Sequence, residues 1–338
     1  MAVIRLSHEA DYALMTSGDD QPESLLSALR AVLTAAGRQA DPHDLAGASG
    51  LAFLFTWADD EPCPARQVLH GRAEALDHAA KVMGMISRPL HPRGADGGAS
   101  CGAFERHFAD SYAPLMITAI EHDQPLLCWG GWDESEVLAA WGVLTRYDPQ
   151  WRRFGGWTVA GQDGPVWLAR PPRAVDVVER VLPQAPPARL LLVGGLHAGA
   201  TWATHPTLVA AGVHVGAEAM DRWAEKLRQP RPFWPADEPQ SWWCHHQLTR
   251  YLSAARISAY EFIYRHAESA PTVAHREACQ RLELLLGEQV ELMAESYDPQ
   301  RIRQAFEGPS GRADLADTVA RLADLERDVQ QALAPLAG

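Results

Sequence analysis

The sequence predicts an α+β domain followed by an all-α helical C-terminal domain. Two apolar segments, Leu126–Trp129 and Trp141–Thr145, are typical of buried strands that share one sheet. Helical periodicity precedes these segments and a β-rich stretch follows them, which is the order expected of an α+β domain. The composition changes around the prolines at 171–172 and 183–187, and helical periodicity dominates after them. We therefore expect one domain over residues 1–175 and a helical domain over residues 176–338.

The first domain is expected to begin with a short strand and three helices. Val3–Leu6 predicts the strand. Pro22–Gly37 has leucines and valines at helical spacing, an acid in its first turn and a glycine at its end, so it predicts a helix. Two further helices are expected over Gly71–Met85 and Ala103–Glu121.

A small-residue segment separates the first two expected helices. Asp44–Trp57 predicts a Gly-Ala-Ser-Gly bend that leads into a strand-like apolar stretch. Gly47 and Gly50 permit backbone geometry or a close approach that larger residues would resist. Further strands are expected at Gly155–Val159 and Pro165–Ala169, joined by a hairpin turn. The helices expected after residue 187 are Leu190–Trp202, Val215–Leu227, Ser241–Ala267, Val273–Glu295 and Ala313–Leu333.

Composition and charge exclude several classes of protein. The 338 residues carry a formal net charge of −13, which argues against a broad nucleic-acid or anionic-membrane surface. The N-terminus lacks the long apolar core of a signal peptide, and no apolar segment of about 18 residues occurs. The five cysteines are widely spaced and form no Cys-x-x-Cys pair, so we expect neither a disulfide framework nor a zinc site. We expect a cytoplasmic protein without a metal or a bound cofactor.

Four segments resemble the motifs of a known family. Ser24-Leu25-Leu26-Ser27-Ala28-Leu29 is similar to the family's Cys-x-x-x-Ala-Leu at the start of its first helix. The family's Gly-x-Ser-Gly-x-x-Phe is matched by Gly47–Phe53, its His-x-x-Val-x-x-Gly-Tyr-Asp strand by Ala140–Asp148, and its closing strand by Val166–Pro171. On these residues the chain resembles the BtrH N-terminal-like, C39-like group of papain-fold proteins. The resemblance covers roughly residues 1–175 and implies a papain-like fold there; beyond it, Trp242–Phe262 is the most family-like segment.

The resemblance also locates the positions of a catalytic triad. A papain-like site needs a thiolate, an imidazole that takes up its proton, and a group that orients the imidazole. The matching positions hold Ser24, Ala140 and Arg170. No histidine lies between His122 and His197, so no small shift of the alignment restores the base. We expect the ancestral chemistry to be lost.

Other residues are candidates for a ligand site or for a nucleophile at a new position. Cys101 precedes an expected helix, whose N-terminus would lower the pKa of a thiol. Cys244-His245-His246 cannot converge on one ion, because adjacent residues of a helix point about 100° apart. Aromatic residues crowd the second half of the first domain, and a cleft is expected where the old active site stood. The ligand-cleft candidates are Trp129, Trp132, Asp133, Tyr147, Trp157 and Ser49.

The sequence therefore favours a catalytically degenerate papain-like protein that acts as a small-molecule-binding or protein-interaction module, in a biosynthetic context. The alternative is an acyltransferase or amide hydrolase of the BtrH-like type, with Cys101 or Ser24 as a re-sited nucleophile. An immunity or regulatory protein that recognises a partner through its tryptophans is a third hypothesis. The helix Ala313–Leu333 has a continuous apolar stripe, which could form a homodimer or pack on its own domain.

Overall fold

The computed structural model describes residues 2–14, 24–59, 73–90, 106–132, 140–158, 164–204, 213–229, 238–294 and 298–337. The chain forms two compact units: residues 1–45 with 69–186, and residues 46–68 with 187–338. The expected boundary between residues 175 and 176 falls inside a strand of the first unit, and the second unit also takes a segment from the N-terminal half. The strand at this boundary was not predicted, because the prolines on both sides of it are typical of a linker.

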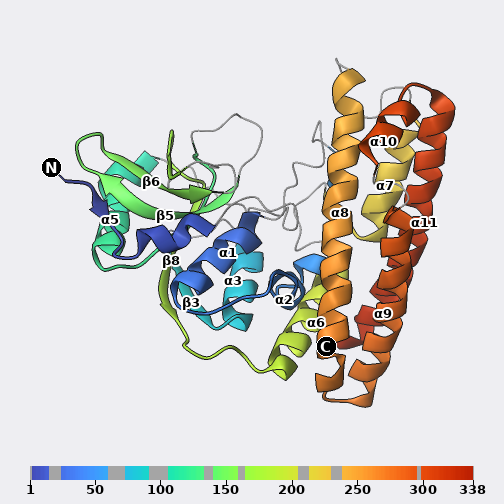
Figure 1. The fold of residues 1–338 in the computed structure, drawn as a ribbon, viewed down its shortest axis with the longest axis horizontal. Coiled ribbons are helices and arrows are strands. Elements are labelled where there is room, and N and C mark those ends of the chain that lie inside the picture. Colours follow the sequence, from blue (N-terminus) through green and yellow to red (C-terminus); the bar gives the residue numbers. More distant parts are fainter. Residues whose placement is uncertain are drawn as a thin grey trace. The chain divides into compact units, whose positions relative to one another are not determined.

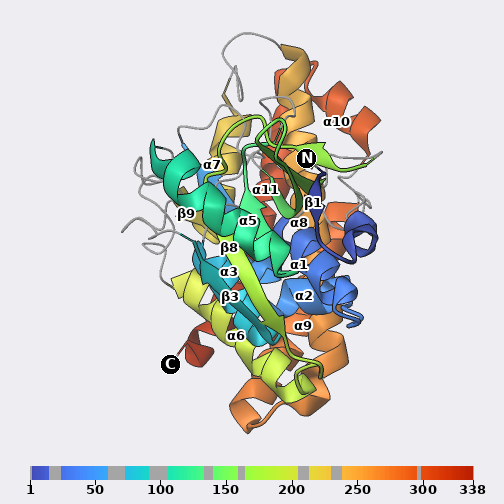
Figure 2. The ribbon, with the colours of Figure 1, turned by 90° about the vertical axis from the view of Figure 1, so that its left-hand side faces the viewer.

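The first unit contains an antiparallel sheet whose strands do not follow their order in the sequence (Figure 1). Its strands are β1 (Ile4–Arg5), β3 (Met85–Pro89), β4 (Leu126–Trp129), β5 (Trp141–Asp148), β6 (Arg153–Thr158), β7 (Val166–Trp167) and β8 (Ala174–Val181). The order along the sheet is β3-β8-β4-β5-β6-β7, and β1 also pairs with β5. The expected pairing of β4 with β5 is confirmed, with Trp129 opposite Trp141. The strands β3 and β8, which Figure 2 shows side by side, were not predicted.

Helices cover the centre of this sheet. They are η1 (Glu9–Leu14), α1 (Ser24–Ala35), α3 (Ala73–Val82), the π-helical turn η4 (Phe108–Tyr112) and α5 (Ala113–Glu121). The helix α1 packs against β5, and α5 packs against β1, β4 and β5. In β4, Leu126, Leu127 and Cys128 are all fully buried, which requires cover on both faces of the sheet. The helix expected at Pro22–Gly37 is confirmed as α1, with its end at Ala35 followed by Gly37 at a φ of 77°.

The second unit is a bundle of helices with one short β-ribbon. Its helices are α6 (Ala188–Thr204), α7 (Ala217–Leu227), α8 (Glu238–His266), α9 (Val273–Ala294), α10 (Pro299–Ala305) and α11 (Pro309–Leu333), with the 3-10 turns η2 (Leu51–Phe53), η6 (Ala267–Ser269) and η7 (Ala334–Leu336). The long helices α8, α9 and α11 run side by side (Figure 1). The stripe of α11 that includes Val319, Leu322 and Val329 is buried in this bundle, so packing within its own unit accounts for it.

The short β-ribbon of the second unit shows that two predictions about this region were wrong. Strand β2 (Thr56–Ala58) pairs antiparallel with β9 (Val213–Val215), so the second unit is not all-α and the predicted helix at Val215–Leu227 begins later, as α7. Residues expected to form a bend and strand-like stretch begin as helix α2 (Pro42–Ala48), which runs from the first unit into the second. The long-range pairing could not be inferred from local periodicity.

The expected role of Gly47 and Gly50 is confirmed. A Cβ at Gly47 would lie 2.1 Å from Cγ of Phe262 on α8, and one at Gly50 would lie 2.5 Å from Cβ of Ala198 on α6. Gly50 also has a φ of 79°, in the left-handed region. The two glycines therefore let this segment lie directly against α6 and α8 within the second unit.

Replacement of Gly156 by alanine tests the packing of the sheet. Gly156 lies opposite Leu144 in the β5–β6 pair, and a Cβ there would lie 2.0 Å from the carbonyl oxygen of Val143. A backbone atom cannot move aside as a flexible side chain would, so G156A should lower the free energy of unfolding by about 2–3 kcal/mol. Urea unfolding followed by circular dichroism measures it.

Gly287 provides the contrast for this test. It lies inside α9, where an added Cβ would meet only the ring of Tyr260, at ordinary distances of 3.7 Å from Cε2 and 4.0 Å from Cδ2. G287A should therefore stabilise the protein by about 0.5–1 kcal/mol, because alanine costs less backbone entropy in a helix. Equal effects of the two variants would contradict the packing described here.

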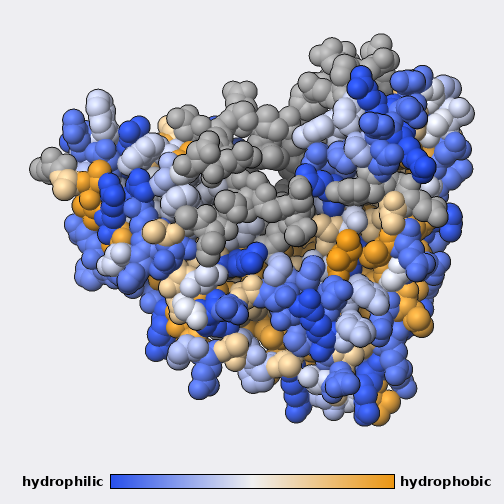
Figure 3. Space-filling model, in the orientation of Figure 1, coloured by the Kyte–Doolittle hydropathy of each residue, from blue (hydrophilic) through white to orange (hydrophobic). Residues whose placement is uncertain are grey.

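The surface of the helical unit is mostly polar on the face that Figure 3 shows, and apolar residues appear there in small groups. Among the residues that the structure describes, Leu284 on α9 is the most exposed large apolar residue, at 77%. Among the helices described, none combines the length and the apolar character needed to cross a bilayer.

Candidate functional site

The structure brings together the residues that match the nucleophile and the base of a papain-like site. Ser24 is the first residue of α1, and its Oγ accepts a hydrogen bond of 3.0 Å from the backbone N–H of Trp141. Trp141 begins β5 and follows Ala140 directly. The start of the first helix therefore contacts the start of this strand, although Ser24 and Ala140 are 116 positions apart in the sequence.

The third matching position joins the same neighbourhood through the backbone. The N–H of Arg170 lies 3.3 Å from the carbonyl oxygen of Gly131, while its side chain belongs to an exposed residue. Next to Gly131, the Trp132 indole Nε1 donates a hydrogen bond of 3.2 Å to the carbonyl oxygen of Ala140. Trp132 thus links the strand start at Ala140 to the chain segment that leads to Arg170.

The described part of this neighbourhood places no base beside Ser24. Among the described residues, the Trp141 N–H is the sole hydrogen-bond partner of Ser24 Oγ, and no base lies within reach of it. Ser24 is also 7% exposed. Its hydroxyl acts as an acceptor for a strand N–H, which is a structural role. A serine without a base stays protonated and is a poor nucleophile.

The candidate tryptophans that the structure describes do not share one face of the sheet. Trp129 lies opposite Trp141, and Val143 lies opposite Trp157, so all four side chains are on one face of the sheet. Trp132 covers the other face, because a Cβ at Gly142 would lie 2.2 Å from its ring. The candidate tryptophans are therefore divided between the two faces, and no exposed flat cluster of these residues results.

The remaining candidates lie elsewhere. Tyr147, near the end of β5, packs its ring 4.8 Å from that of Phe154. Ser49 belongs to the second unit, is fully buried, and donates a hydrogen bond from Oγ to the carbonyl oxygen of Ala46 at 2.9 Å. Asp133 and Cys101 lie outside the described residues.

Cysteines and histidines of the described residues show no metal centre. No three of the described histidine, cysteine, aspartate and glutamate side chains are placed to share an ion. Burial raises the pKa of the Cys128 thiol well above its usual range, so this cysteine stays protonated. Cys244 is disulfide-bonded, although the spacing of the cysteines predicted no disulfide framework.

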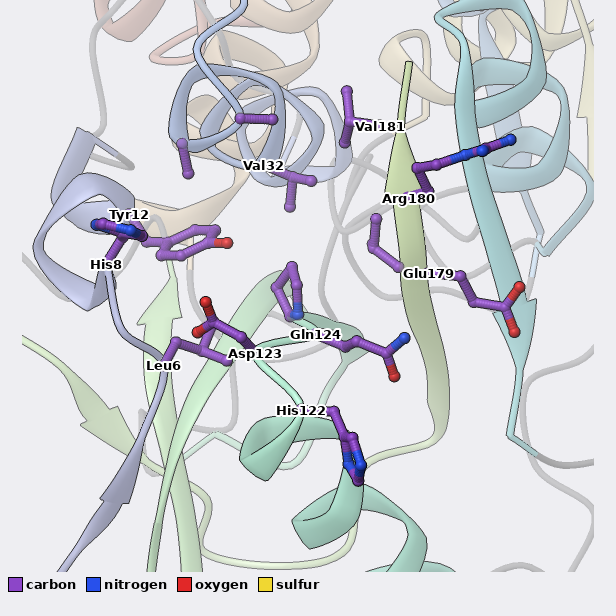
Figure 4. Close-up of a pocket in the computed structure, with 14 residues that line it drawn as sticks. Leu6, His8, Tyr12, Val32, His122, Asp123, Gln124, Glu179, Arg180 and Val181 are labelled. Atoms are coloured by element: carbon purple, nitrogen blue, oxygen red, sulfur yellow. The ribbon is translucent and has the colours of Figure 1, made fainter. Parts of the chain in front are cut away.

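A cavity of about 320 Å³ lies within the first unit at the other end of α1 (Figure 4). Four segments line it: residues 6–12 after β1, the last turns of α1, the turn between α5 and β4, and the C-terminal half of β8. The cavity contacts Val32 and Ala35 of α1, which lie roughly 12–16 Å along the helix from Ser24. This cavity is thus distant from Ser24 and from the start of β5.

The cavity was not predicted, because its walls come from four segments far apart in sequence. One signal was present: Asp123 stands where a glycine usually ends a helix. It has a φ of 61° after α5, and its Oδ1 accepts a hydrogen bond of 2.6 Å from the N–H of Ser7. Aspartate is among the non-glycine residues that adopt this conformation most readily, so the turn suits the residue found there.

Comparison with models of known protein families finds no match to the chain. A search of curated proteins likewise finds no significantly similar sequence.

Proposed function

We propose that the protein is a catalytically degenerate papain-like protein of the BtrH/C39-like kind that works as a small-molecule-binding module. The observation that carries the proposal is the hydrogen bond from the Trp141 N–H to Ser24 Oγ. It supports a papain-like layout, because the first helix and the strand of the base position meet there. It also supports the loss of catalysis, because the hydroxyl serves as an acceptor where a nucleophile would need a base.

A binding role is favoured over an interaction role by two further features. Of the described tryptophans in the first unit, Trp151 is exposed at 66% and the others are buried or half-buried, so they offer no flat aromatic surface to a partner. The first unit keeps a cavity of about 320 Å³, which lies at the lower end of the range for small-ligand pockets.

The test combines an acylation assay with a ligand screen. The native protein and S24A are each incubated with S-acetyl-N-acetylcysteamine, an acyl thioester, and examined by intact-protein mass spectrometry. We expect no acetyl adduct on either protein and no burst of free thiol. In parallel, we expect at least one class of small molecule to raise the thermal midpoint of the native protein.

Ser24→Ala should also affect stability. It leaves the buried N–H of Trp141 without its acceptor and should lower the free energy of unfolding by about 1–3 kcal/mol. An adduct that is lost in S24A, or one that maps to Cys101, would instead establish the acyltransferase alternative. If no small molecule shifts the midpoint, the binding function is wrong.

A further inference from the structure

The cavity at the C-terminal end of α1 has an apolar floor. Leu6, Val32 and Val178, which are 5%, 1% and 3% exposed, line it together with the buried Pro125. This floor suits a hydrocarbon or aromatic group of a ligand, since removing such a group from water is favourable.

One polar group of the inner wall points into this space. Tyr12 is 7% exposed, and its hydroxyl is directed into the cavity between η1 and α1 (Figure 4). Among the residues that the structure describes, none makes a hydrogen bond with this hydroxyl. A hydroxyl that faces a cavity pairs with water or with a ligand group, so this one is available to a polar group placed in the cavity.

The electrostatic environment of the Tyr12 hydroxyl is negative. Burial, together with the carboxylates of Asp123 and Asp11, raises the pKa of Tyr12 above its usual range, so the phenol stays neutral. The carboxylate of Asp123 stands at the rim, and only its Oδ1 is used by Ser7. Its other lone pairs remain available to a ligand.

The guanidinium of Arg180, which lines the cavity, is directed away from Tyr12. The side chains of Arg180 and Glu179 extend from β8 away from Tyr12 (Figure 4). Glu179 is paired with Arg88 at 2.8 Å. The imidazole Nδ1 of His122 lies 2.7 Å from the carbonyl oxygen of Thr118 in its own helix, so this nitrogen is already used.

From these observations we propose that the cavity binds a small organic ammonium ion. The ligand's apolar body would lie on the floor formed by Leu6, Val32 and Val178, and its N–H groups would donate to the Tyr12 hydroxyl and the Asp123 carboxylate. The proposal rests on the proposed binding function and adds to it the position of the site and the class of ligand.

The test uses a charged probe and its neutral isostere. 3-Phenylpropylamine is cationic at pH 7.5, whereas 3-phenylpropan-1-ol has the same shape without the charge. Isothermal titration of the native protein should show the amine binding at least about tenfold more tightly than the alcohol, because a charged donor strengthens the hydrogen bond to a carboxylate.

Two variants locate the binding site. D123N keeps an oxygen for the N–H of Ser7 and tolerates the left-handed backbone, but it removes the charge. It should weaken amine binding about tenfold and leave alcohol binding unchanged. Y12F should weaken amine binding about threefold. D110N, at an exposed position at least about 15 Å away along the same helical segment, is the matched control and should change neither affinity.

Each other result overturns the inference in a recognisable way. Equal binding of amine and alcohol would reject the ammonium class. Amine binding that survives D123N and Y12F would reject the site. If neither probe binds, this inference fails while the ligand screen described above still decides the binding function independently. Unchanged circular dichroism spectra of the variants establish that they fold.

Discussion

Replacement of Glu326 by glutamine is expected to lower the free energy of unfolding of the helical unit by about 3–5 kcal/mol, the largest loss among the substitutions considered. Glu326 on α11 and Arg256 on α8 form an ion pair with 2.8 Å between Oε2 and Nη2, and their side chains are 1% and 0% exposed. Arg256 Nη1 also donates to the carbonyl oxygen of Ala52 at 2.7 Å, and Gln289 Nε2 donates to Glu326 at 3.0 Å. The neutral variant would leave the guanidinium buried without a counter-charge.

The exposed ion pair of Arg327 and Asp221 is the matched control. Both side chains are about half exposed, at 46% and 48%, and Arg327 follows Glu326 on the same helix. D221N should therefore cost no more than about 1 kcal/mol. Guanidinium unfolding monitored by tryptophan fluorescence gives both values. Equal losses in E326Q and D221N would show that the buried pair is not essential, whereas the double change R256M/E326L should recover part of the stability lost in E326Q.

This ion pair also shows where sequence reasoning reaches its limit. Arg256 belongs to the segment that most resembles the papain-like family after residue 175, and its helix was predicted correctly from periodicity as α8. Its partners were not predicted. Ala52 lies 204 residues before Arg256, and Glu326 lies on another helix, so no local pattern relates them. Periodicity predicts which face of a helix is buried and does not identify the partner.

The sheet shows the same limit. Strands β4 and β5 were predicted because each is a continuous apolar segment, as expected for strands buried on both faces. Strand β8 was missed, although its first half is equally buried, because Asp176 interrupts its apolar residues and prolines flank it. Its neighbour β3 was also missed: the predicted helix ended at Met85, the first residue of β3, and the four residues that follow show no buried apolar pattern.

The juxtaposition of Ser24 with the start of β5 was suggested by the resemblance alone. Composition and spacing alone do not relate Ser24 to Ala140, yet the structure connects Ser24 to the next residue, Trp141. The cavity near Tyr12 and Asp123 had no such guide. Cavities of this kind depend on the docking of separate segments, which a single sequence leaves undetermined.

Acidification is expected to destabilise the helical unit through His245. This histidine on α8 is 2% exposed, and its Nδ1 accepts a hydrogen bond of 3.1 Å from the indole Nε1 of Trp223. The ring also packs against those of Trp223 and Phe306. Burial, and to a lesser degree the neighbouring His246, lowers the pKa of His245 to about 3. The imidazole is therefore neutral in the folded protein, with its proton on Nε2.

The sign of the effect follows from the difference between the two states. In the unfolded chain the imidazole takes up a proton near pH 6.5, whereas the folded protein excludes it until about pH 3. Within that window the unfolded state binds more protons, so the free energy of unfolding falls as pH falls, by up to about 1.4 kcal/mol per pH unit. Between pH 6.5 and 5, where few carboxylates titrate, we expect a loss of about 1–2 kcal/mol from this group.

Replacement of His245 by glutamine isolates this contribution, because the amide oxygen can still accept from Trp223 while no proton is taken up. Urea unfolding at pH 5 to 8 gives the free energy of unfolding as a function of pH, and the slope of this curve gives the number of protons taken up on unfolding. Near pH 5.5 this number should be smaller for H245Q than for the native protein by about one. H197Q, which removes an exposed histidine of α6 in the same unit, should leave the slope nearly unchanged. If H245Q keeps the pH slope of the native protein, then His245 already accepts its proton in the folded state. The assignment of a neutral imidazole bonded to the Trp223 indole would then be wrong.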